Sequence, residues 1–191
     1  GLKNNMEDIL KSNEVDLKNL IDSENYTKAF YDRLKLTPER IEGMASGIED
    51  IIELNDPIGE VLSMWKRPNG LQIGKTRVPL GVVGIIYEAR PNVTVDATAL
   101  TLKAGNAVIL RGSSEAINSN KILVQVIKNS LQKTKVPADS VSLIEDTSRE
   151  SAVELMKQKD YLDVLIPRGG RGLIQAVVQN SQVPVIETGE G

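Results

Sequence analysis

Glycines stand at the junction between a strand-like run and a helix-like run in DVLIPRGGRGLIQAVV, residues 163–178. Gly169, Gly170 and Gly172 leave the backbone N–H groups of this junction open to an anion such as a phosphate. The segment is not a complete Gly-x-Gly-x-x-Gly motif, because Gln175 takes the last glycine position, and it lacks the Gly-Lys-Ser/Thr of a P-loop. By itself the junction is a weak indication of a nucleotide site.

A second strand-like run ends in polar residues in the segment AVILRGSSEA. Arg111 ends the run, Gly112 allows a close approach of the backbone, and Ser113 or Ser114 is expected to cap the helix that follows. A helix N-terminus beside a guanidinium suits a phosphate or a ribose. The alternative is an ordinary N-cap with a surface arginine, and the sequence leaves both open.

A third run, in GIIYEARPNVTVDA, is followed by Glu88, Arg90 and Asn92, with Pro91 fixing the turn between them. Arginine binds an oxyanion through two parallel hydrogen bonds, so Arg90 is a candidate for holding an anionic substrate. The alternative is a turn with solvated charges, in which Arg90 pairs with Glu88 or with a carboxylate at the start of a helix and only holds the turn.

The elements that position these residues alternate between strand and helix. Apolar runs at 82–87, 107–110, 141–144, 162–166 and 185–186 are separated by helical patterns at 95–102, 114–131, 149–157 and 173–178. Strands that are apolar throughout are typical of a parallel sheet with both faces covered. We therefore predict an α/β fold with a doubly wound, Rossmann-like parallel sheet, whose ligands bind outside the carboxyl ends of the strands.

Residues 5–54 show helical periodicity, with Thr37 and Pro38 as the N-cap and first residue of the strongest helix. Alternating runs around Asn69-Gly70 then predict a β-hairpin. We divide the chain into an N-terminal helical segment (1–59), a β-hairpin arm (60–78) that packs against another subunit or domain, and a dinucleotide-binding α/β domain (79–191).

Composition excludes several classes of site. The 191 residues include no cysteine and no histidine, which removes disulfides, thiolate nucleophiles, imidazole bases and nearly all ordinary zinc sites, so no metal site is expected. The net charge of −3, with basic residues spread along the chain, is unlike a nucleic-acid-binding protein. No apolar run is long enough to span a bilayer. We expect a soluble, cytoplasmic protein that binds neither nucleic acid nor membrane.

Several segments together resemble one family. YEARPNVT is the most specific, and AVILRGSSEA, LIEDTSRE, LIPRGGRGLI and VPVIETGEG agree with it. Over nearly its whole length the chain is similar to the glutamate-5-semialdehyde dehydrogenases, or γ-glutamyl phosphate reductases, of the aldehyde dehydrogenase superfamily. The resemblance implies an aldehyde dehydrogenase-like NADP-binding domain. It also implies reduction of L-glutamyl 5-phosphate by NADPH to L-glutamate 5-semialdehyde, NADP⁺ and phosphate in proline biosynthesis, by a full-length enzyme that is a homo-oligomer.

The resemblance also implies residue roles. The adenosine ribose and a 2′-phosphate would be held by Arg111, Gly112, Ser113, Ser114 and Glu115, and the pyrophosphate would face Gly169, Gly170 and Gly172. Glu187 corresponds to an active-site glutamate, and Asn92 to an asparagine that stabilises an oxyanion. Arg90 is then expected to bind the substrate, which carries an acyl phosphate and an α-carboxylate.

One departure from the family is large. Its members use a cysteine thiolate as nucleophile, and this chain has none before it ends at Gly191. We therefore expect the cofactor-binding portion of the enzyme without its catalytic domain, inactive on its own. Two alternatives stay open: a nucleotide-binding module with no chemistry, and a fragment that serves only in assembly.

Overall fold

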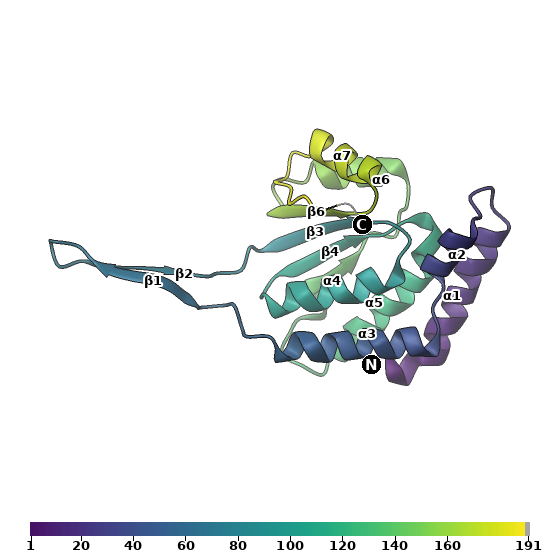
Figure 1. The fold of residues 1–191 in the computed structure, drawn as a ribbon, viewed down its shortest axis with the longest axis horizontal. Helices are drawn as coiled ribbons and strands as arrows, with labels where there is room; N and C mark the ends of the chain where they lie inside the picture. Colours follow the sequence, from purple (N-terminus) through teal and green to yellow (C-terminus); the bar gives the residue numbers. More distant parts are fainter. Residues whose placement is uncertain (190–191) are drawn as a thin grey trace.

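The computed structural model describes residues 1–189, so that Glu190 and Gly191, the end of the predicted α/β domain, lie outside the described residues. Its centre is a parallel sheet of four strands in the order β5-β4-β3-β6 (Figure 1). The strands are β3 (Val82–Tyr87), β4 (Ala107–Arg111), β5 (Val141–Leu143) and β6 (Val164–Arg168). The chain passes from β3 outward to β5 and then returns to place β6 on the other side of β3. This order creates a switch point between β3 and β6, where doubly wound sheets bind ligands.

Helices cover both faces of the sheet, as the apolar runs predict. One face carries α4 (Pro91–Lys103) and α5 (Ile117–Leu131), and the other carries α6 (Arg149–Met156) and α7 (Arg171–Asn180) (Figure 1). Side chains of β3 alternate between two cores, with Val83 and Ile85 packing towards α4 and α5 and Ile86 towards α6 and α7. The predicted doubly wound α/β fold is confirmed.

Some predicted boundaries are wrong. The helix predicted from residue 95 begins at Pro91, because proline suits the first helical position, where its fixed φ is helical and no N–H is needed. The strand predicted at 162–166 runs from Val164 to Arg168. The predicted strand at 185–186 is only an isolated bridge between Leu165 and Val185. The helix predicted at 114–131 is divided into a 3₁₀ turn, η2 (Ser114–Ala116), and α5.

The N-terminal helices form a further layer outside α4 and α5 (Figure 1). They are α1 (Met6–Ile21), which follows the 3₁₀ turn η1 (Lys3–Asn5), α2 (Lys28–Leu34) and α3 (Pro38–Glu53). The hydroxyl of Thr37 accepts a hydrogen bond from the Arg40 N–H, as the predicted N-cap requires. Buried polar groups join this layer to the sheet domain, because the carboxylate of Asp16 in α1 accepts the backbone N–H groups of Asn118 and Ser119 in α5.

The predicted hairpin is present as β1 (Val61–Lys66) and β2 (Gln72–Thr76), and it projects away from the body of the molecule (Figure 1). Gly70 has φ +84° in its turn, a conformation that favours glycine. The arm exposes large apolar side chains, with Met64 64% and Trp65 44% exposed. Apolar surface of this kind is typical of a contact with another protein surface.

Candidate functional site

The glycine junction after β6 lies at the switch point and holds a carboxylate. Glu88 follows β3, and its Oε1 accepts a hydrogen bond from the Gly170 N–H at 2.9 Å. A Cβ at Gly169 would lie 2.7 Å from Cδ of Glu88, so any side chain there would displace the glutamate. Gly170 is also the N-cap of α7, where the helix dipole favours negative charge. The junction thus accepts an anionic group, and in this structure that group belongs to the protein.

At the end of β4, Arg111 reaches towards the loop before α6. Its Nη2 donates to the backbone oxygens of Thr147 at 2.7 Å and Ser148 at 2.8 Å. Burial lowers the pKa of the guanidinium, and the nearby Asp146 and Glu115 carboxylates oppose that shift. An arginine nevertheless stays protonated at any physiological pH. Arg111 therefore holds a loop of its own domain with one nitrogen while remaining a cation.

Polar atoms without partners surround this strand end. Within the described residues, Arg111 Nε, Ser113 Oγ and Asn120 Nδ2 are buried and have no hydrogen-bond partner. Leaving such buried groups unpaired costs free energy. Asn120 is 0% exposed, so contact with a ligand does not account for its unpaired nitrogen. Packing alone explains the glycine at position 112, because a Cβ there would lie 2.2 Å from Nδ2 of Asn120.

The predicted capping by Ser113 or Ser114 is wrong. Ser113 stands at the N-cap of η2, but its side chain makes no capping hydrogen bond. The first amides of α5 instead point at Asp16, which is 1% exposed and lies 103 positions before Ser119. The sequence around the start of α5 gives no signal of this cap, because the acceptor, the carboxylate of Asp16, belongs to another helix. Ser114 and Glu115 line a separate cavity of about 230 Å³ beside the end of α1.

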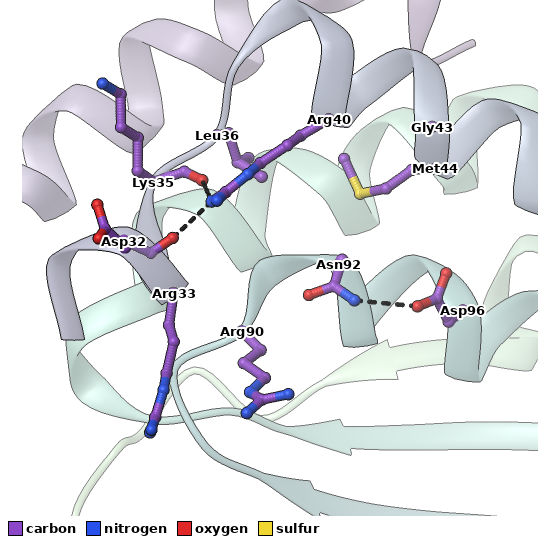
Figure 2. Close-up of a pocket in the computed structure, with 10 residues that line it drawn as sticks. All are labelled: Asp32, Arg33, Lys35, Leu36, Arg40, Gly43, Met44, Arg90, Asn92 and Asp96. Carbon is purple, nitrogen blue, oxygen red and sulfur yellow. Dashed lines mark hydrogen bonds between the residues drawn. The ribbon is translucent and has the colours of Figure 1, made fainter. Parts of the chain in front are cut away.

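Two neighbouring cavities lie beside the start of α4. The larger, about 580 Å³, is lined by residues of α2, α3 and α4, among them Arg33, Arg90, Asn92 and Asp96 (Figure 2). The smaller, about 220 Å³, lies at the switch point and includes Glu88, Gly169 and Gly170. Arg33 and Arg90 line both cavities, so the two are parts of one site.

Asn92 lies in the first turn of α4 rather than in a preceding turn, and its Nδ2 donates to Oδ2 of Asp96 at 3.1 Å (Figure 2). Burial raises the pKa of Asp96, while the hydrogen bond from Asn92 and the charge of Arg168 lower it in part. The second N–H of the Asn92 amide is left for a ligand in the larger cavity, since an amide carries two donors.

Glu187 is not brought into either cavity. It is exposed and follows Ile186, whose N–H donates to the Leu165 oxygen at 3.0 Å. Its neighbour Thr188 donates to the Pro167 oxygen at 2.7 Å and lines the smaller cavity. The structure therefore gathers Arg90, Asn92 and the glycine junction. It places Glu187 beside them. The Arg111 group lies at the end of β4, which is next to β3 and two strands, about 10 Å at ordinary strand spacing, from β6.

Two arginines of this site, Arg33 and Arg168, were not predicted from the sequence. Arg168 stands between a strand and a glycine, which is the same signal that identified Arg111. Arg33 lies in the segment of helical periodicity at residues 5–54, and nothing in the sequence around it indicates a ligand contact.

The described residues contain neither a metal-binding cluster nor a membrane-spanning helix. Among residues 1–189, no group of three or more Asp, Glu, His or Cys residues is placed to hold a metal ion. In the same range, each helix is too short or too polar to cross a membrane.

Comparisons with known proteins agree with one another. A family model described as the aldehyde dehydrogenase family matches residues 4–186. A gamma-glutamyl phosphate reductase of Clostridium beijerinckii is 61% identical over 184 residues, which are 96% of this chain and 44% of that protein. The chain thus spans less than half the length of this curated relative.

Solved structures of proteins with the same name have the same fold. The gamma-glutamyl phosphate reductase of Thermotoga maritima matches with a TM-score of 0.96 at 45% identity, covering 100% of this chain and 46% of that one. The enzyme of that name from Saccharomyces cerevisiae matches with a TM-score of 0.89 at 32% identity, covering 100% of this chain and 48% of that one.

Proposed function

The chain belongs to the aldehyde dehydrogenase family, and from this premise we propose that it carries the cofactor site of a cytoplasmic, NADPH-dependent reductase of proline biosynthesis. The reaction is the conversion of L-glutamyl 5-phosphate, NADPH and a proton into L-glutamate 5-semialdehyde, NADP⁺ and phosphate. The observation that carries the proposal is the 61% identity, across 96% of this chain, to a relative named gamma-glutamyl phosphate reductase. Membership of the family itself implies a nicotinamide cofactor.

The residues at the ends of β4 and β6 suit such a cofactor. The unpaired Arg111 Nε and Ser113 Oγ are proposed as donors for ribose or 2′-phosphate oxygens. Gly112, Ser114 and Glu115, which follow β4 in the chain, are proposed to belong to the same cofactor site, although Ser114 and Glu115 line a separate cavity in this structure. The junction at Gly169, Gly170 and Gly172 offers backbone N–H groups to the pyrophosphate, provided that Glu88 leaves Gly170. The cofactor, when bound, supplies a hydride to the acyl carbon.

On the substrate side, Arg90 is proposed to bind the anionic groups of glutamyl phosphate. Within residues 1–189 its guanidinium pairs neither with Glu88, whose carboxylate is bound to Gly170, nor with a carboxylate at the start of a helix. The turn-holding alternative therefore has no supporting contact. Asn92 is proposed to donate its free amide N–H to the oxygen on the reacting carbon, and Glu187 to serve as the active-site carboxylate. No residue of this chain is assigned the covalent step, because the sequence has no cysteine.

The hairpin is proposed to contact a second copy in a homo-oligomer. Its exposed apolar side chains, including Met64 and Trp65, are the supporting observation.

We further propose that the chain is part of a longer protein, because its match covers only 44% of the relative from Clostridium beijerinckii. The test of the proposed function is an assay of that full-length protein. We expect NADP⁺-dependent oxidation of glutamate semialdehyde that requires inorganic phosphate, which is the proposed reaction in reverse. The second candidate is a nucleotide-binding module without chemistry, favoured by the absence of cysteine and histidine from these 191 residues. Tight NADPH binding by the full-length protein with no turnover in either direction would select that candidate.

Arg111→Ala is expected to weaken NADPH binding by the full-length protein by about 1–3 kcal/mol more than NADH binding. The reason is the loss of a charge-assisted contact with the 2′-phosphate, which NADH lacks. Calorimetric titration with both cofactors measures the difference, and Arg149→Ala, a nearby arginine at the start of α6, is the control. Equal losses for both cofactors would mean that Arg111 serves only to hold Thr147 and Ser148.

A further inference from the structure

Three arginines from three separate elements line the 220 Å³ cavity at the switch point. Arg33 comes from α2, Arg90 is the N-cap of α4, and Arg168 ends β6. Among the described residues that line this cavity, one is acidic, Glu88, and its carboxylate is hydrogen-bonded to the Gly170 N–H. The cavity is therefore predominantly cationic.

Two of the three guanidinium groups have no partner in the described residues. Between residues 1 and 189, neither Arg33 nor Arg90 makes a side-chain hydrogen bond or an ion pair. Figure 2 shows both side chains extending in the same direction, from α2 and from the start of α4. Arg168 interacts electrostatically with Asp96, which faces the larger cavity.

A neighbouring arginine shows what a structural role looks like in this region. Arg40 also lines the larger cavity, but its Nη1 donates to the backbone oxygens of Asp32 and Lys35 and so holds the end of α2 (Figure 2). Arg33 and Arg90 make no such contact. Like charges gathered in a cavity repel one another and concentrate anions there, and the planar guanidinium matches a phosphate through paired hydrogen bonds.

The two connected cavities differ in charge. The larger cavity is lined by the carboxylates of Asp32 and Asp96 as well as by basic side chains. It therefore suits the part of a ligand that carries both a positive and a negative charge. Its volume of about 580 Å³ lies within the usual range for small-molecule sites. The smaller one suits a compact anion. A substrate with a phosphate at one end and an ammonium and a carboxylate at the other matches both.

We propose that Arg33 and Arg168 join Arg90 in binding the phosphate group of the substrate in the smaller cavity, whose glycine junction is left to the pyrophosphate of the cofactor. The α-amino-acid end of the substrate then lies in the larger cavity. This inference rests on the proposed function for the identity of the substrate. It assigns α2, a helix far from the sheet in sequence, a direct part in substrate binding.

The kinetic test uses the full-length protein in the oxidising direction, where inorganic phosphate is a substrate. Arg33→Ala and Arg168→Ala are each expected to raise the KM for phosphate by roughly tenfold to a hundredfold, as the loss of one charge-assisted contact implies. The KM for NADP⁺ should stay within about twofold, and Arg33→Lys should lose less than Arg33→Ala because it keeps the charge. Lys135→Ala, which removes a positive charge between α5 and β5 at the opposite end of the sheet, is the matched control and should leave the KM for phosphate unchanged.

A binding measurement separates this inference from the proposed function. Inorganic phosphate is titrated calorimetrically into the full-length protein without cofactor, at constant ionic strength, for wild type, Arg33→Ala, Arg168→Ala and Lys135→Ala. Weaker binding in both arginine variants and not in Lys135→Ala supports the phosphate site even if the protein proves to have no reductase activity. An active reductase whose arginine variants keep the wild-type KM for phosphate overturns the inference while the function stands. Absence of measurable phosphate binding to the wild-type protein also overturns it.

Discussion

Replacing Asp16 by alanine is expected to lower the free energy of unfolding of the 191-residue chain by about 3 kcal/mol. The Asp16 carboxylate accepts four hydrogen bonds: Oδ1 from the N–H and Nδ2 of Asn118, and Oδ2 from the N–H and Oγ of Ser119. All are made across the interface between α1 and α5, with Asp16 1% exposed. The substitution leaves buried backbone donors unpaired at the start of α5, and water cannot replace the lost acceptor without opening the interface.

Urea unfolding followed by circular dichroism measures this loss, and Glu14→Ala provides the control. Glu14 is an exposed carboxylate on the same helix, so its removal changes the net charge equally and should alter stability by no more than about 0.5 kcal/mol. Amide hydrogen exchange gives a local readout, because the Ser119 N–H should lose protection in Asp16→Ala. If the two variants lose equal stability, the contact between Asp16 and α5 does not stabilise the fold.

The 191-residue chain on its own is expected to show no reductase activity, whereas the full-length protein is expected to be active. The chain has neither cysteine nor histidine, so it offers no thiolate to attack the acyl phosphate and no imidazole to activate a serine hydroxyl. An ester formed on serine would in addition accept a hydride less readily than a thioester.

The assay compares the two proteins at equal molar concentration, with NADPH consumption in the presence of glutamyl phosphate as the signal. Circular dichroism of the 191-residue chain must show the α/β secondary structure, so that loss of activity does not merely reflect unfolding. Turnover by the folded chain above the rate without enzyme would contradict the prediction and would require a different nucleophile.

The sheet and the polar residues that follow its strands could be predicted, because each is encoded in a short stretch of sequence. Val82–Tyr87 is apolar throughout, which a strand covered on both faces requires, and Asn69-Gly70 suits a turn that needs a positive φ. The start of α4 was misplaced by four residues for an equally local reason. Pro91 can either fix a turn or begin a helix, and packing of the helix against the sheet decides between them.

Which residues of the site meet one another could not be predicted without the tertiary structure. The glycines at 169 and 170 were predicted to face a bound anion, but at least one of their amides meets the carboxylate of Glu88, 82 positions earlier in the chain. The cap of α5 was predicted from its own serines and is supplied by α1. Arg33 carried no signal, since one arginine on a short amphipathic helix has no pattern that distinguishes a ligand contact from a solvated charge.

The sequence by itself thus determined the order of strands and helices along the chain, the hairpin and most of the polar residues at the carboxyl ends of the strands. Periodicity, turn chemistry and strand polarity act over a few residues, so they can be read without knowing what lies nearby in space. Only the tertiary structure decided which of those polar groups meet. Packing of α1 and α2 against the sheet domain brings Asp16 to α5 and Arg33 to Arg90, and such contacts depend on helix placement rather than on any local pattern.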